Sequence, residues 1–324
     1  VRSDAVLLGG TALLPCDFSQ STEDHAQISW QRKTKGKPLV DNFFVIESAT
    51  KHNYVNGGDN RFKFIGDFPK RDGTLQLSNV TLMDEGTYTC IFTFFNSGNL
   101  RKEVSLTVFV PPSTSLKAEE IFEGDEEVHL ASCAARGAKP RALVRWDTTN
   151  IQETLRFTNS TTPHENGTVT TVSSLFGIPT QNITARPVRC IVTSEALREE
   201  LVLPLTLQIN FPPLNTLISE RSDDFECISE ANPSASITWR KHSSPNSLRK
   251  ELSLSKPVSA EGATLSFLKK KSDLQGLFEC EAKNRYGSQT AYLYVHLHSD
   301  CWTYGIGRRS HQMKAAHQKT THSD

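Results

Sequence analysis

The sequence predicts an all-β chain made of three tandem β-sandwiches followed by a disordered tail. Six of the seven cysteines fall into three widely spaced pairs. Each pair encloses a tryptophan shortly after its first cysteine, at Trp30, Trp146 and Trp239. This Cys…Trp…Cys unit is typical of immunoglobulin-like sandwiches, in which an indole packs against a disulfide between two sheets. We therefore predict three such domains, with the disulfides Cys16–Cys90, Cys133–Cys190 and Cys227–Cys280.

The composition excludes several classes of protein. Lys plus Arg and Asp plus Glu both total 36, so the formal net charge is zero and a nucleic-acid partner is not expected. No two cysteines lie close enough to form a C-x-x-C zinc or redox motif. The motifs of nucleophile elbows, zinc proteases, phosphate loops and dinucleotide sites do not occur either. We expect no enzyme activity, no cofactor and no metal.

Proline pairs mark the expected domain boundaries. Two alternating apolar segments run into Pro111-Pro112 and into Pro212-Pro213. Because proline cannot donate to a sheet ladder, each pair is expected to end a last strand and to stiffen a short linker. Residues 291–295 (AYLYV) are typical of one more closing strand. The predicted units are 1–110, 111–210, 211–298 and a disordered tail over 299–324.

The first domain is predicted to be variable-type and the other two constant-type or C2-type. Its cysteine interval is the longest of the three and leaves room for the extra strands C′ and C″, with residues 43–46 as the C′ candidate. Tyr88, two residues before Cys90, predicts a tyrosine corner. We also expect Arg61 and Asp84 to form a salt bridge at the lower end of the sandwich. These residues are assigned structural roles only.

The expected compartment is extracellular. Asn-x-Ser/Thr sequons, the acceptors of N-glycosylation, occur at Asn79, Asn159, Asn166 and Asn182. Together with three predicted disulfides, they indicate a secreted or cell-surface chain. Neither a signal peptide nor an apolar run long enough to span a bilayer is recognisable, so we interpret the chain as a mature ectodomain or a soluble form. Cys301 has no predicted partner.

Two segments carry a family resemblance. Residues 88–99 read YTCIFTFFNSGN and residues 167–175 read GTVTTVSSL. The first is similar to the Y-x-C-x-[FY]-x-T-F-P-x-G-N segment, and the second to the G-T-V-T-V-T-S-L run, of the nectins and the poliovirus-receptor (nectin-like) group of cell-adhesion molecules. The resemblance covers residues 1–298. It implies docking through the sheet of strands C, C′, C″, F and G, with an F–G loop aromatic entering a pocket of the partner.

By ungapped matching, that aromatic is Phe95. Its physical support is independent, because adjacent residues of a strand cannot both face the core, so Phe94 or Phe95 should point outward. An exposed aromatic on a rigid hairpin is a typical interface anchor. The family's T-F-P reads Phe94-Phe95-Asn96 here, and its A-x6-G motif is not recognisable, which leaves the choice of partner open. The partner-binding candidates are Gln27, Phe43, Phe94, Phe95, Asn96 and Gly98.

The resemblance implies an adhesion molecule whose first domain binds an identical chain or a related nectin-like protein. A second hypothesis is an immune ligand that activating or inhibitory lymphocyte receptors recognise, and viral glycoproteins are a further partner class that the family implies. A third hypothesis is a soluble decoy. Homophilic adhesion and immune recognition differ in whether the first domain self-associates and clusters cells.

Overall fold

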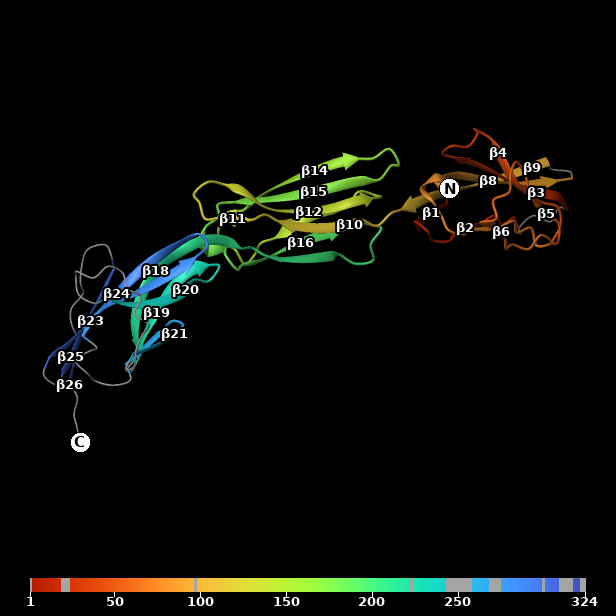
Figure 1. Ribbon diagram of the computed structural model, residues 1–324. Coiled ribbons are helices and arrows are strands. Elements are labelled where there is room, and N and C mark those ends of the chain that lie inside the picture. The colour runs from red at the N-terminus through yellow and green to blue at the C-terminus, as the bar shows by residue number, and fades with distance from the viewer. Residues whose placement is uncertain are drawn as a thin grey trace. The chain divides into compact units, whose positions relative to one another are not determined.

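A computed structural model describes residues 2–18, 24–95, 98–221, 224–242, 258–267, 275–298, 301–308 and 317–320. Strands dominate it throughout (Figure 1). Its three disulfides are Cys16–Cys90, Cys133–Cys190 and Cys227–Cys280. The prediction of three disulfide-linked sandwiches is therefore confirmed.

The first sandwich consists of a six-stranded and a three-stranded sheet. The larger sheet has the order β1-β9-β8-β3-β4-β5, and the smaller one β2-β7-β6. Strands β4 and β5 occupy the places expected for C′ and C″, so the variable-type prediction is confirmed. The bounds are β1 (Arg2–Leu7), β2 (Ala12–Leu14), β3 (His25–Thr34), β4 (Asp41–Ile46), β5 (His52–Tyr54), β6 (Phe62–Phe64), β7 (Leu75–Leu77), β8 (Gly86–Phe94) and β9 (Gly98–Phe109), with the 3₁₀ turn η1 (Leu82–Asp84) before β8.

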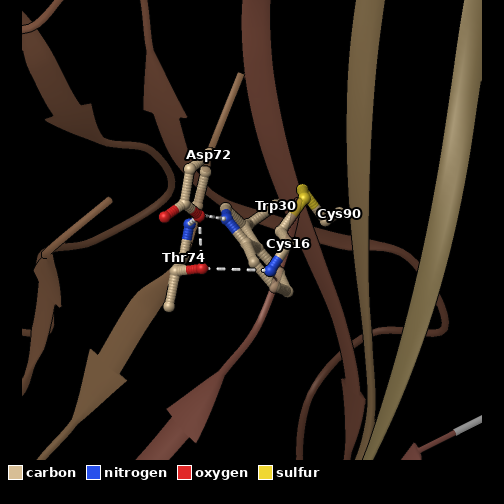
Figure 2. Close-up of a disulfide and its surroundings, with 6 residues drawn as sticks. Cys16, Trp30, Asp72, Thr74 and Cys90 are labelled. Carbon is tan, nitrogen blue, oxygen red and sulfur yellow. Dashed lines mark hydrogen bonds between the residues drawn. A yellow bond between two sulfur atoms is a disulfide. The ribbon is translucent and has the colours of Figure 1, made fainter. Parts of the chain in front are cut away.

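The core of this sandwich surrounds its disulfide. Figure 2 shows Trp30 beside the Cys16–Cys90 bridge. The Trp30 indole is fully buried and donates from Nε1 to the backbone oxygen of Gly73 at 2.9 Å. The Cys16 amide donates to Thr74 Oγ1 at 3.2 Å. Because the polar groups next to the bridge have partners, the two sheets close over it without orphaned donors.

The second sandwich packs a four-stranded sheet, β10-β12-β15-β14, with a three-stranded sheet, β13-β16-β17. Trp146 Nε1 donates to Ser173 Oγ at 3.0 Å within the buried interior. This hydrogen bond joins β13 to β15, and the second disulfide joins the same two sheets through Cys133 on β12 and Cys190 on β16. The bounds are β10 (Ser113–Ala118), β12 (Val128–Ala138), β13 (Leu143–Asp147), β14 (Arg156–Pro163), β15 (Val169–Gly177), η2 (Gln181–Ile183), β16 (Pro187–Thr193) and β17 (Leu201–Thr206).

The third sandwich surrounds a core that includes Trp239, Leu265, Phe278 and Leu293. Its sheets have the orders β11-β18-β19-β22-β21 and β20-β23-β24-β25-β26. The bounds are β11 (Ile121–Phe122), β18 (Ile209–Arg221), β19 (Asp224–Asn232), β20 (Ser236–His242), β21 (Val258–Glu261), β22 (Thr264–Phe267), β23 (Gly276–Asn284), β24 (Gly287–His298), β25 (Cys301–Arg308) and β26 (His317–Thr320).

The two proline pairs behave differently. Pro111-Pro112 separates β9 from β10, as expected. Pro212-Pro213 lies inside the 13-residue strand β18, which does not stop there. The pairing of β18 with β19 shifts register between Phe211 and Leu214 and again before Leu217. These irregularities place the prolines where the ladder does not need their missing N–H donors.

Residues 301–308 form strand β25, although the sequence predicted a disordered tail over 299–324. The strand pairs antiparallel with β24. Tyr304 and Ile306 are partly buried and pack against the third core. Trp302, Tyr304 and Ile306 alternate with small or polar residues, so a period of two was present in the sequence. Only the edge that β24 offers makes this short pattern a strand.

Candidate partner-binding site

At the end of the first sandwich where β8 begins, buried polar side chains hydrogen-bond to one another. We call this the closed end. Tyr88 Oη donates to the backbone oxygen of Asp84 at 2.8 Å, and Tyr88 is fully buried. Arg61 donates to both Asp84 oxygens, from Nη1 at 2.7 Å and from Nη2 at 2.8 Å. Burial disfavours the charged form of Asp84, but hydrogen bonds from Arg61 and Thr81 outweigh it and lower the pKa of Asp84. The predicted tyrosine corner and salt bridge are both confirmed.

The opposite end of β8 presents an aromatic side chain to solvent. Phe94 is 3% exposed and stacks on Phe92, with ring centroids 5.9 Å apart. Phe95 follows it and is 72% exposed. The Phe95 amide donates to the backbone oxygen of Asp24 at 3.4 Å, which ties the base of the loop to the residue before β3. As the strand alternation predicted, one of the two phenylalanines points inward and the other outward.

The remaining members of the predicted F–G site can be placed only in part. Asn96 lies outside the described residues. Gly98 opens β9 opposite Phe94 and has φ +81°, a left-handed conformation that glycine adopts without steric cost. Gln27 lies on β3 opposite Thr93 and is partly exposed.

Phe43 and Phe94 were expected to contact a partner, and the structure corrects this expectation. Phe43 is 2% exposed and packs on Phe62, with ring centroids 4.6 Å apart. The pairing of β3 with β4 shifts register between Trp30 and Gln31. This bulge turns Phe43 inward beside an already inward Phe44, so two consecutive residues enter the core. Neither Phe43 nor Phe94 can reach a partner while the domain stays folded.

Strand register identifies the residues on the exposed side of the larger sheet, of which the sequence analysis named only Gln27. Residues paired across β5, β4, β3, β8 and β9 point to the same side, away from the core. We call this surface the outer face. It comprises Gln27, Ser29, Gln31, Asn42, Val45, Asn53, Thr89, Ile91, Thr93, Asn99, Arg101 and Glu103. The signal that could have found it is the alternation of Thr89, Ile91 and Thr93 along β8.

The outer face is mostly polar and uncharged. Ile91 and Val45 flank Ser29 in one row of the face, and Ile91 is only 5% exposed. Arg101 and Glu103 are its two charged members and are of opposite sign. A broad sheet surface with few charges and an aromatic at one end is suited to another protein surface, where aromatic anchors combine with polar contacts.

Two absences hold for the residues that the structure describes. No three His, Cys, Asp or Glu side chains among them gather as a metal site would require. Of the helical segments found there, none is long and apolar enough to cross a membrane.

Family models match all three domains. An immunoglobulin V-set domain model matches residues 2–109, a CD80-like C2-set immunoglobulin domain model matches 110–200, and an immunoglobulin I-set domain model matches 211–297. The third domain is thus similar to the I-set type in particular. Together the models cover the three sandwiches that the disulfides define.

Curated relatives are similar to this chain over much of its length. Nectin-4 of Xenopus tropicalis is 25% identical over 302 residues, which is 90% of this chain and 54% of that protein. Nectin-2 of Mus musculus is 31% identical over 213 residues, 64% of this chain and 39% of the relative. Nectin 1b of Danio rerio is 26% identical over 320 residues, 91% and 56% respectively. The chain spans about half the length of these relatives.

Proposed function

The chain belongs to the nectins of the immunoglobulin superfamily, and from this premise we propose that it is an extracellular cell-adhesion molecule. Its first sandwich binds the first sandwich of another molecule through the outer face. The partner is a second copy of this chain or a related nectin. The second and third sandwiches act as a stalk, and the sequons at Asn79, Asn159, Asn166 and Asn182 are acceptors for glycans.

One observation carries the proposal: Phe95 stands 72% exposed at the end of the outer face. Its backbone amide is tied to Asp24 and its neighbour Phe94 is buried in the core, so the backbone that leads into the exposed ring is anchored. Preorganisation of this kind reduces the entropy lost on binding. One sandwich face buries a modest area, so many weak contacts between cells are expected to supply the strength of adhesion.

The charges of the outer face favour self-recognition over a strongly charged partner. Arg101 and Glu103 lie two residues apart on β9, on the same side of the sheet. In a two-fold symmetric contact, the same patch of each copy meets the other, so Arg101 of one copy can face Glu103 of the second. A zero formal net charge also removes long-range repulsion between copies.

The test measures self-association of the whole chain and clustering of cells that display it. Phe95→Ala should weaken association at least tenfold, because a buried aromatic anchor contributes about 2 kcal/mol. Leu13→Ala is the matched control, since Leu13 is an exposed apolar residue on β2 of the other sheet. Equal association by the two variants would contradict the proposal.

Charge reversal separates self-binding from binding to a different protein. Arg101→Glu alone should weaken self-association, and adding Glu103→Arg should restore it. A chain that stays monomeric at high concentration, and whose cells do not cluster, would instead favour recognition by a different receptor, such as one on lymphocytes.

A further inference from the structure

Strand β14 differs from the other strands of the second sandwich because all of its residues are exposed. It forms one edge of the sheet β10-β12-β15-β14 (Figure 1). Phe157, in this strand, is 55% exposed. A long exposed edge with an aromatic residue is a template for unwanted pairing with other chains, which natural sheets usually protect.

The register shows which side of β14 is uncovered. Phe157 pairs with Leu175, Asn159 with Ser173, and Thr161 with Thr171. These β15 partners are buried, at 0%, 0% and 4% exposure. Cross-strand partners point to the same side of a sheet, so Phe157, Asn159 and Thr161 face the side of the core. The opposing sheet therefore covers β15 but leaves these three residues, which we call the β14 strip, open.

The β14 strip contains a glycosylation signal as well as the aromatic ring. Asn159-Ser160-Thr161 is a sequon, and its asparagine and its threonine both belong to the strip. The other three sequons have their asparagines outside the strands, Asn79 and Asn166 in bends or turns and Asn182 in η2. Phe157 and Asn159 are residues i and i+2 of one strand, and such residues lie about 6.6 Å apart on one face. A sugar ring attached to Asn159 can therefore reach the ring of Phe157.

We propose that Asn159 carries an N-linked glycan whose first sugar packs against Phe157 and covers the open edge of β14. The face of an aromatic ring is electron-rich, and the C–H groups on one face of a pyranose are its complement. Stacking therefore removes apolar surface of Phe157 from water with favourable electrostatics. The glycan also places a bulky hydrophilic group where a strand of another chain would pair.

The modification uses a sugar donor of known chemical class, an oligosaccharide carried on a lipid diphosphate. The Asn159 Nδ2 forms a bond to the anomeric carbon C1 of the first N-acetylglucosamine. The bond from C1 to the diphosphate oxygen breaks, and the lipid diphosphate leaves as the anion. One amide proton is lost to a base of the transferring enzyme, so no redox change occurs.

The test uses the full chain secreted from mammalian cells. Mass spectrometry of glycopeptides measures the occupancy of Asn159, and hydrogen exchange measures the protection of β14 and β15. Thr161→Ala removes the sequon but keeps Asn159 and Phe157, whereas Phe157→Ala keeps the sequon and removes the ring. Asn182→Gln removes a sequon elsewhere and serves as the control.

We expect Asn159 to be occupied and Thr161→Ala to speed exchange in β14 about fivefold, as a coupled pair in contact would predict. In the Phe157→Ala background the same loss of glycan should change exchange little, and Asn182→Gln should leave β14 unchanged. An unoccupied Asn159, or equal acceleration with and without Phe157, would overturn the proposal. So would protection of β14 that rises with concentration of the glycosylated chain, because a second copy would then cover the edge.

Discussion

The two ends of strand β8 differ in their side chains, with buried polar groups at its start and an exposed aromatic ring at its end. At its start, the buried carboxylate of Asp84 accepts hydrogen bonds from Arg61, and the hydroxyl of Tyr88 donates to the backbone oxygen of Asp84. At its end, Phe95 is exposed and only its backbone is tied. At the first end, the buried Asp84 carboxylate and Tyr88 hydroxyl both have hydrogen-bond partners, whereas at the second end the apolar ring of Phe95 stays in contact with water. We infer that the first end supplies stability and the second recognition.

Phe94→Ala should have the largest effect and tests whether the exposed end depends on the core beneath it. Removing this buried ring should lower the free energy of unfolding by about 4 kcal/mol, because the transfer energy is lost and a cavity remains. Chemical denaturation measures the loss. A much smaller value would mean that Phe94 is not held in the core.

Asp84→Ala removes the buried carboxylate of the closed end. It should cost about 3 kcal/mol, because the Arg61 guanidinium and the Thr81 amide lose a buried partner. Partner affinity of the protein that remains folded should not change. If this variant lost binding without losing stability, the division of roles between the two ends would be wrong.

Tyr88→Phe removes only the hydroxyl of the corner. We expect a loss of about 1 kcal/mol, typical of one buried hydrogen bond whose acceptor is left unpaired. The third sandwich provides the comparison, since it carries the fully buried Phe278 at the equivalent place and has no corner hydroxyl. Thermal melting compares Tyr88→Phe with Phe278→Leu, which changes packing and removes no hydroxyl. The stability lost with the hydroxyl can thus be separated from the stability lost with the ring.

Acid should weaken the closed end before the exposed one. The pKa values of Asp84 and Asp59 lie below their ordinary value of 3.8 because hydrogen bonds from Arg61 outweigh the effect of burial. Their contribution to stability is present above the ordinary pKa and is lost as pH falls through the lowered values. Melting followed from about pH 5 to about pH 2 should show this loss, and Asp84→Ala should flatten it.

Phe95→Ala should have the smallest effect on stability, within about 0.5 kcal/mol, as for most exposed positions. Denaturation of this variant beside Phe94→Ala compares two adjacent phenylalanines with opposite roles. A cost near that of Phe94→Ala would show that Phe95 supports the fold and would remove the argument that it is kept for binding.

The spacing of cysteines and tryptophans was sufficient to predict three sandwiches and their disulfides. The reason is physical, because a disulfide spans a fixed distance and few arrangements let it pack against an indole in a core only two sheets thick. The corner was equally readable, because Tyr88, Asp84 and Arg61 act through short contacts tied to the position of Cys90. In contrast, the strand at 301–308 required the edge of β24, which no local pattern reveals.

By itself, the sequence determined the all-β architecture, the pairing of cysteines and the fact that one of Phe94 and Phe95 must face outward. Only the tertiary structure decided which one does, that a bulge buries Phe43, and that the outer face runs through Thr89, Ile91 and Thr93. Side-chain alternation is a local property of one strand. Bulges, register and the extent of the opposing sheet depend on strands far apart in the chain, and they determine which surfaces remain open.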